Sequence, residues 1–153
     1  MPLTFTPIKP DKADVWLAVA RGAWLADEGV FLEKARRGAG LREGVAFALR
    51  DGAEILGTVM LVQTLYDQPQ SASLFALAVA PKHQGKGLGR RILAESCTHL
   101  RRQGITQVRL FTSMAGKFYE KAGFKEFGTL PLGSKKYKFF YKDISPDMRQ
   151  AQS

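Results

Sequence analysis

The segment that most constrains the fold of this chain is an apolar run that passes directly into a glycine-rich stretch. The run, Leu74–Ala80, holds seven consecutive apolar residues, which is typical of a strand covered on both faces. It is far shorter than the roughly 20 residues that a membrane-spanning helix needs. Pro81 ends the run, and three glycines follow before apolar residues recur at helical spacing up to Leu100. A further strand is predicted at Ile105–Phe111, and this strand–helix–strand order predicts two parallel strands.

Segments on both sides of this central unit predict antiparallel strands. Residues 3–8 are expected to form a first strand. Residues 45–62 are expected to form a hairpin around Asp51-Gly52, a favoured pair in tight turns. Two closing strands are expected near the C-terminus, at 124–130 and 136–144. The fold class is therefore α+β, a mixed sheet with helices on its faces.

Helices are also predicted before and after the central unit. Pro10 opens the first of them, and apolar residues at helical spacing follow it. The other is short, runs over 114–123 and ends at Gly123, a residue type that often ends helices. A length of 153 residues suits one domain, which we assign to 1–145, followed by a polar tail at 146–153.

The composition restricts the kinds of ligand and the cellular compartment that we expect for this protein. The formal net charge of +9 favours an anionic ligand, an anionic substrate or nucleic acid, and disfavours a polycationic substrate. Cys97 is the only cysteine, so no intramolecular disulfide can form, and we expect a cytoplasmic protein. No apolar signal-peptide region opens the chain.

The two histidines, His83 and His99, lack metal-ligand spacing, so no metal is expected, and His83 is expected to face solvent.

The glycine stretch Gln84–Gly89 partly matches two known phosphate-binding loops. A dinucleotide fingerprint would need glycine at position 90, where Arg90 stands, and a Walker A loop would need Ser or Thr in place of Gly87. Glycines let backbone N–H groups approach a ligand closely, and a helix N-terminus attracts anions. On its residues alone, the stretch is therefore either a phosphate-binding loop or a tight strand-to-helix turn.

Two segments taken together resemble the landmarks of one family. LAVAPKHQGKGLG, at 77–89, resembles the acetyl-coenzyme A binding signature of the GNAT superfamily of N-acetyltransferases, whose fixed positions match Gln84, Gly87 and Gly89. MAGKFYEKAGF, at 114–124, resembles the second landmark of that superfamily; the matching residues are Ala115, Phe118, Tyr119, Gly123 and Phe124. The resemblance implies a central mixed, mostly antiparallel sheet of six to seven strands with a splayed parallel pair, flanked by about four helices.

The resemblance also implies an activity and a set of site residues. The activity is transfer of an acetyl group from acetyl-coenzyme A to a primary amine, by direct attack in a ternary complex. The backbone of the apolar strand would hold the pantetheine arm, and the glycine loop would hold the pyrophosphate. The implied cofactor contacts are Leu77, Ala78, Val79, Gln84, Gly85, Lys86, Gly87, Leu88, Gly89, Arg90, Ser113 and Phe118. Tyr119 is the implied general acid, because a phenol with a pKa of about 10 suits protonation of the leaving thiolate.

The general base stays open. Many relatives carry a glutamate on the strand before the cofactor loop, where this chain has Ser73. Asp67, in the loop before that strand, and Glu28, in the region that usually walls the acceptor pocket, are the two candidates. A chain of water molecules is a third route. The alternative interpretation of both residues is a solvated surface carboxylate.

Two other functions also stay open. The same fold would serve as a sensor or partner module that binds an acyl-coenzyme A without transferring the acyl group, as the missing strand carboxylate suggests. The charge of +9 instead favours nucleic acid, as in an acetylase of aminoacyl-tRNA. The alternating lysines and aromatics of 133–143 suit binding of single-stranded nucleic acid, or else an edge strand with Phe139 and Tyr141 pointing inward.

The acceptor is expected to be a small-molecule or peptide amine. No membrane contact is expected, and a homodimer is compatible with the family.

Overall fold

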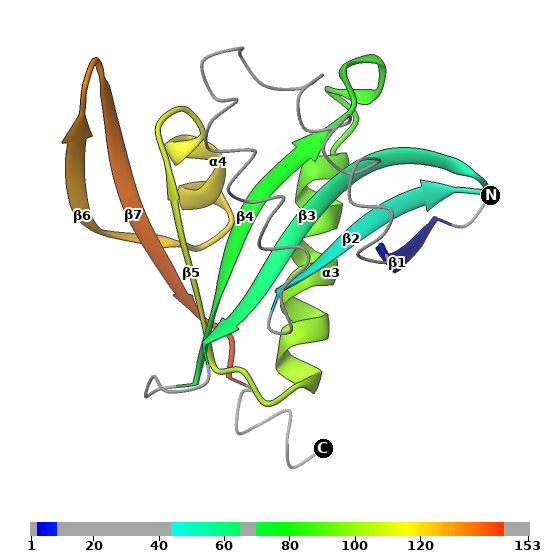
Figure 1. The fold of residues 1–153 in the computed structure, drawn as a ribbon, viewed down its shortest axis with the longest axis horizontal. Helices are drawn as coiled ribbons and strands as arrows, with labels where there is room; N and C mark the ends of the chain where they lie inside the picture. The colour runs from blue at the N-terminus through cyan, green and yellow to red at the C-terminus, as the bar shows by residue number, and fades with distance from the viewer. Residues whose placement is uncertain (1–2, 9–43, 65–69, 146–153) are drawn as a thin grey trace. The chain divides into compact units, whose positions relative to one another are not determined.

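Figure 1 shows the computed structural model of the chain, which describes residues 3–8, 44–64 and 70–145. The chain divides into two compact units, and each is described by itself. The first unit comprises Met1–Gln63 and Leu74–Ser96, and the second comprises Thr64–Ser73 and Cys97–Ser153. Four features named above lie outside the described residues: the helix after Pro10, Glu28, Asp67 and the tail at 146–153.

The first unit contains an antiparallel set of strands. β1 (Thr4–Ile8) pairs with β2 (Gly44–Asp51), and β2 pairs with β3 (Glu54–Thr64). β4 (Ser71–Val79) is the neighbour of β3 in the strand order, and its later residues belong to this unit. The expected first strand, the hairpin and the apolar strand are therefore confirmed.

The turn of the β2–β3 hairpin lies one residue later than expected. Asp51 pairs with Glu54, so the turn consists of Gly52 and Ala53 rather than of Asp51 and Gly52. Gly52 has a φ of 60°, a left-handed conformation that glycine adopts without steric cost. An Asp-Gly pair marks a turn but leaves its register open, because the register is set by which strand residues pair.

β3 carries a bulge close to the end of β4. The register shifts between Leu49 and Arg50 of β2, which leaves Leu56 as the extra residue of β3. The carbonyl oxygen of Leu56 accepts the N–H of Ala80 at 2.8 Å. A bulge bends the strand and leaves its extra residue out of the ladder. Here the extra residue joins β3 to the residue that follows β4.

α3 (Leu88–Arg102) follows the glycine stretch, and its apolar stripe is buried as expected. Ile92, Leu93 and Leu100 are each at most 3% exposed. Cys97 is buried on the same stripe, and burial raises the pKa of its thiol. Gly104, with a φ of 85°, follows the last turn of the helix and confirms the expected stop.

Gly57 lies where β3 packs closely against α3 and β4. A Cβ at this position would lie 2.5 Å from Cδ1 of Ile92 and 2.7 Å from the carbonyl oxygen of Ala78. Both distances are shorter than a side chain tolerates, so glycine is the residue that fits here. The close packing holds the end of β4 in place within the first unit.

The second unit holds the parallel pair and the closing strands. Its elements are β5 (Gln107–Thr112), α4 (Gly116–Lys121), β6 (Lys125–Leu132) and β7 (Lys135–Asp143). Ser71–Ser73 of β4 pairs in parallel with Gln107–Arg109 of β5, which confirms the parallel strands. β6 and β7 form an antiparallel hairpin, drawn in orange in Figure 1, and β7 also pairs with β5.

The expectation of an edge strand at β7 was wrong. β7 lies between β5 and β6, so it is an interior strand. Phe140 is the residue that is fully buried, whereas Phe139 and Tyr141 lie on the other face and are half-buried. Alternation separates residue 140 from 139 and 141, but tertiary packing decides which face is covered. The ring of Tyr119 in α4 lies 6.3 Å from that of Phe140 and helps to cover it.

The strands of the described residues follow the order β1-β2-β3-β4-β5-β7-β6. The seven strands lie within the expected six to seven. Their pairing is mostly antiparallel with one parallel pair, which confirms the α+β class. In the part of the chain that the structure describes, no helix is long and apolar enough to span a membrane. Over the same residues, no three His, Cys, Asp or Glu side chains gather into a metal-binding group.

Candidate active site

The expected pantetheine-binding segment is the end of β4. Ala78 is 3% exposed, and its neighbours Leu77 and Val79 are half-buried. One turn of 3-10 helix, η3 (Pro81–His83), follows the strand, with Pro81 at its first position. Proline suits this position because its φ is fixed and its missing N–H is not needed there. The strand therefore enters the glycine loop through a stiff turn.

The glycine loop contains two residues whose backbone favours glycine. Gly85 has a φ of 81° and Gly87 a φ of 79°, both in the left-handed region. Beyond the neighbouring residues, no atom lies within 4 Å of a Cβ placed on either glycine. Both glycines and Lys86 between them are exposed. The loop thus presents uncovered backbone to open space, as an anion-binding loop requires.

The start of α3 adds positive charge to this loop. Leu88 and Gly89 form the first turn and are half-buried, while Arg90 is exposed. The N-terminus of a helix carries a partial positive charge, and the first turn of α3 contains no acidic residue. Together with the side chain of Lys86, this arrangement suits a pyrophosphate group.

Gln84 makes a contact that the sequence did not predict. Its side-chain Nε2 donates to the carbonyl oxygen of Val79 at 3.1 Å. The family resemblance implies two separate contacts, one between Gln84 and the pyrophosphate and one between the Val79 backbone and pantetheine. In the structure the two residues bind each other, so Gln84 fixes the glycine loop against the end of β4.

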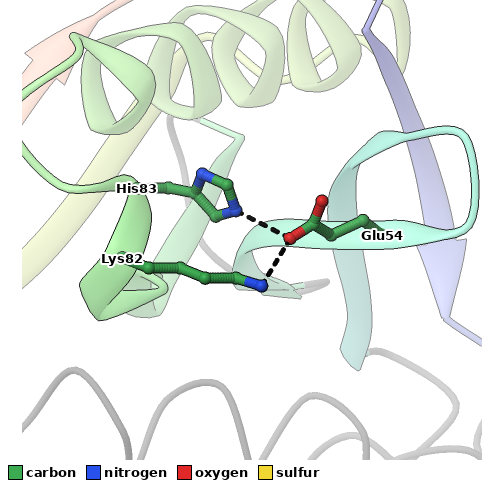
Figure 2. Close-up of polar contacts among 3 residues, drawn as sticks. All are labelled: Glu54, Lys82 and His83. Atoms are coloured by element: carbon green, nitrogen blue, oxygen red, sulfur yellow. Dashed lines mark hydrogen bonds and ion pairs between the residues drawn. The ribbon is translucent and has the colours of Figure 1, made fainter.

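Figure 2 shows an acidic side chain that sequence analysis missed. Oε1 of Glu54, the first residue of β3, lies 2.8 Å from Nζ of Lys82 and 2.9 Å from Nε2 of His83. These two partners, Lys82 most strongly, lower the pKa of Glu54 to about 2. The expectation that His83 faces solvent was wrong, because its side chain is only 16% exposed. Glu54 and His83 are 29 positions apart, and no local pattern joins them.

The second landmark lies in the second unit and centres on Tyr119. This residue of α4 is 7% exposed. Its ring lies 5.0 Å from that of Phe118, 5.6 Å from that of Phe124 and 6.3 Å from that of Phe140. Burial raises the pKa of the Tyr119 phenol, so its hydroxyl keeps its proton at neutral pH.

The turn that leads into α4 is held by a threonine. Oγ1 of Thr112 accepts the N–H of Met114 at 3.2 Å and that of Ala115 at 3.0 Å. Such bonds satisfy backbone donors that a helix start leaves without partners. Ser113 lies within this turn and Phe118 in α4 after it; both are predicted cofactor contacts, and both are half-buried.

An aromatic cluster covers the face of β5, β7 and β6 that is opposite to Tyr119. Its ring contacts have centroid distances of 5.6 to 6.0 Å. The cluster consists of Phe111, Phe127, Tyr137, Phe139 and Tyr141. A hollow of about 310 Å³ on this face is lined by Gln107, Arg109, Phe127 and Tyr141.

Three of the four lysines of β7 do not share the face of the aromatic cluster, whereas Lys135, the first residue of the strand, does. Lys136, Lys138 and Lys142 alternate with Tyr137, Phe139 and Tyr141, so they point to the opposite face of the strand. Binding of a single strand by charge and stacking needs both groups on one surface. The alternation in β7 therefore places most of its lysines away from the aromatic side chains that would stack on bases.

The two candidate bases, Asp67 and Glu28, lie outside the described residues, and the two landmarks lie in different units. Ser73, which stands where many relatives carry a glutamate, is half-buried in β4. The glycine loop belongs to the first unit and Tyr119 to the second.

Comparison with known proteins identifies a family over much of the sequence. The family model of the acetyltransferase (GNAT) domain matches residues 42–126, more than half of the chain. A mycothiol acetyltransferase of Kocuria rhizophila is 36% identical over 63 residues. That match covers 39% of this chain and 21% of the relative, so the chain spans about a fifth of that protein's length.

Solved structures share the fold over nearly the whole chain. A GNAT-family protein of Desulfovibrio desulfuricans has a TM-score of 0.78 at 20% identity, covering 94% of this chain and 100% of its own. The ribosomal-protein-S18-alanine N-acetyltransferase of Escherichia coli has a TM-score of 0.72 at 18% identity, covering 95% and 96%. An aminoglycoside 6'-N-acetyltransferase complexed with coenzyme A has a TM-score of 0.71 at 17% identity, covering 94% and 98%. Since the family model spans more than half of the sequence and includes both landmarks, this chain belongs to the GNAT acetyltransferase family.

Proposed function

We propose that this protein is an N-acetyltransferase that moves an acetyl group from acetyl-coenzyme A to a primary amine in a ternary complex. The observation that carries the proposal is the glycine loop, which presents exposed backbone at Gly85 and Gly87 and leads into a helix start without acidic residues. The family supports the choice of ligand, because GNAT proteins use acetyl-coenzyme A and one structural neighbour is a coenzyme A complex.

The loop and the end of β4 would hold the cofactor. The backbone N–H groups of Gly85–Gly89 would donate to the pyrophosphate, with Lys86 and Arg90 adding positive charge. The backbone of Leu77–Val79 would bind the amides of pantetheine. Gln84 would act indirectly, by fixing the loop on Val79. Ser113 and Phe118 stay predicted contacts from the second landmark.

Tyr119 would supply the proton for the leaving group. Bound acetyl-coenzyme A would supply a thioester, whose C–S bond would break as the amine nitrogen bonds to the carbonyl carbon. Oη of Tyr119 would donate the proton that the leaving thiolate takes up. Burial makes this phenol a weaker acid than an exposed one. Burial also raises the pKa of a thiol, as it does for Cys97, so shielding from water shifts the pKa of the acid and that of a leaving thiol in the same direction.

The base that takes the proton from the amine is still a prediction. Asp67, Glu28 and a water chain are the candidates. Glu54 does not fill the role, because Lys82 and His83 lower its pKa to about 2 and leave it a weak base. A base effective near neutral pH needs a pKa closer to that range.

The acceptor is proposed to be a small-molecule or peptide amine. Similar proteins are named for acetylation of aminoglycosides and of an alanine of ribosomal protein S18, so both kinds of acceptor occur on this fold. Because the field of a protein with a net charge of +9 repels a polycation, we propose an acceptor with fewer positive charges than the aminoglycosides and spermidine for which two structural neighbours are named. We also propose a cytoplasmic location, on the single buried cysteine.

A coenzyme A release assay tests the proposal. Purified protein and acetyl-coenzyme A are mixed with a panel of amino acids, antibiotics, polyamines, peptides and aminoacyl-tRNA. We expect saturable release that depends on at least one amine. Absence of calorimetric binding of both acetyl-coenzyme A and coenzyme A would overturn the proposal. Slow release that no amine accelerates would instead favour the sensor or partner module.

A gel-shift experiment tests the alternative that the protein acts on or binds nucleic acid. Binding of tRNA with an affinity that falls steeply with salt would support contact with nucleic acid, since phosphate contacts release counterions. Lack of binding at low salt would dismiss it.

A further inference from the structure

The turn η3 stands between the end of β4 and the glycine loop, so its position sets where the loop begins. Backbone bonds close the turn: the N–H of His83 donates to the carbonyl oxygen of Ala80 at 2.8 Å. One backbone bond joins this region to β3, from the N–H of Ala80 to the carbonyl oxygen of Leu56 at 2.8 Å. That bond lies before the turn. The bond from Nε2 of Gln84 to the carbonyl oxygen of Val79 spans the turn, but it attaches the loop to β4 and not to β3.

Glu54 supplies a second attachment, on the far side of the turn. It precedes Leu56 by two positions in β3, and one of its oxygens contacts both Lys82 and His83 (Figure 2). Lys82 and His83 are the last two residues of η3, and Gln84 and Gly85 follow them directly. β3 therefore holds the turn at two points, at Ala80 through Leu56 and at its final residues through Glu54.

The exposure of Glu54, Lys82 and His83 limits how much their contacts contribute to the overall stability of the protein. The side chain of Glu54 is 44% exposed and that of Lys82 is 72% exposed, whereas that of His83 is 16% exposed. Ion pairs that are this accessible contribute little to the free energy of unfolding, because water screens them. The consequence of the contact is therefore local and concerns the orientation of the turn.

We propose that Glu54 is a positioning residue for the cofactor loop, an inference that rests on the proposed function. By holding Lys82 and His83, Glu54 keeps η3 in the orientation from which the backbone of Gly85 and Gly87 faces an anion. A negative charge close to an anion-binding loop opposes the ligand through Coulomb repulsion. Loss of the positioning contact should weaken binding of coenzyme A, whereas loss of the negative charge should strengthen it. The direction in which the Kd changes when the Glu54 carboxylate is removed therefore distinguishes the two effects.

The test compares two substitutions that remove the same charge. Glu54→Gln keeps the size of the side chain, and Glu95→Gln removes a carboxylate that pairs with Arg91 on α3, at 3.1 Å, without touching the turn. We expect Glu54→Gln to raise the Kd for coenzyme A about three- to fivefold by titration calorimetry. Glu95→Gln should leave this Kd unchanged or lower it. Unchanged or tighter binding by Glu54→Gln would overturn the proposal.

Two further measurements distinguish positioning from a general loss of structure. In the unliganded protein, hydrogen exchange of the amides of Gln84–Leu88 should be faster in Glu54→Gln than in Glu95→Gln, with the same urea midpoint for both. In the release assay, Glu54→Gln should raise the KM for acetyl-coenzyme A and leave kcat unchanged. Equal exchange in the two variants would count against positioning. If the unmodified protein binds no coenzyme A, the proposed function fails; if it binds and Glu54→Gln binds equally well, only this inference fails.

Discussion

The ring of Tyr119 packs edge-on against the ring of Phe124, with 5.6 Å between the centroids and 71° between the planes. The N–H of Phe124 also donates to the carbonyl oxygen of Tyr119 at 3.0 Å. The chain reverses between them at Gly123, whose φ is 94°. A glycine and a phenylalanine after the tyrosine therefore end α4 and hold the phenol in its buried position.

Replacement of Tyr119 by phenylalanine tests the acid role. Because Phe118, Phe124 and Phe140 surround the ring, Tyr119→Phe keeps the packing and removes only the hydroxyl. We expect the Kd for coenzyme A to stay the same and kcat to fall by about 100-fold or more, as for loss of a general acid. Calorimetry and the release assay measure the two quantities. Unchanged kcat would remove Tyr119 from the acid role.

The pH dependence of kcat provides a second check on Tyr119. Burial raises the pKa of this phenol above its usual value of about 10. A raised pKa keeps the protonated form to higher pH, so the acid should remain available throughout the range from pH 6 to about 9.5. We expect no fall in kcat on the alkaline side of this range. A descending limb that is present in the unmodified enzyme and absent from Tyr119→Phe would contradict a raised pKa.

Replacement of Gly87 by alanine separates backbone strain from ligand binding. Gly87 and Gly133 both have a positive φ and open space around a Cβ, but Gly133 lies in the turn between β6 and β7. Each Gly→Ala change should lower the free energy of unfolding by about 1 kcal/mol. Only Gly87→Ala should raise the Kd for coenzyme A, by about tenfold, because its methyl group projects where the ligand would approach. Equal Kd values for the two variants would contradict a phosphate site at the loop.

Replacement of Gly57 by alanine tests the close packing below the end of β4. The added methyl group would collide with Ile92 and with the carbonyl oxygen of Ala78, so the free energy of unfolding should fall by about 1–3 kcal/mol. Gly128→Ala is the matched control in β6, because its Cβ would meet Phe139 at an ordinary 3.9 Å. Urea unfolding measures both. Similar free energies of unfolding for the two variants would contradict the close packing of β3 against α3 and β4 at Gly57.

Local patterns predicted most of the elements correctly, because their signals lie within a few residues. The apolar run before Pro81 and the glycines after it mark β4 and the loop, whatever the rest of the chain does. Burial of Ile92 and Leu100 follows from their helical spacing. The turn of the β2–β3 hairpin was displaced by one residue because the pairing of Asp51 with Glu54 depends on the whole register of two strands.

The errors concern features that depend on more than one element. β7 has the alternation of an edge strand, but β6 pairs along its outer side, and α4 packs over Phe140 rather than over its neighbours. The contact of Glu54 with His83 spans 29 positions and two elements. No composition or spacing rule identifies such a pair, because the β2–β3 hairpin and η3 must first be folded against each other.

By itself the sequence determined the order of elements, the glycine loop with its helix start, and the tyrosine landmark, because each is written in consecutive residues whose backbone preferences act locally. Only the tertiary structure decided that Gln84 binds Val79, that Glu54 holds Lys82 and His83, and that Gly57 lies against Ile92. These contacts join residues from different elements. Their geometry is fixed by strand register and by helix packing, which arise when the elements pack together.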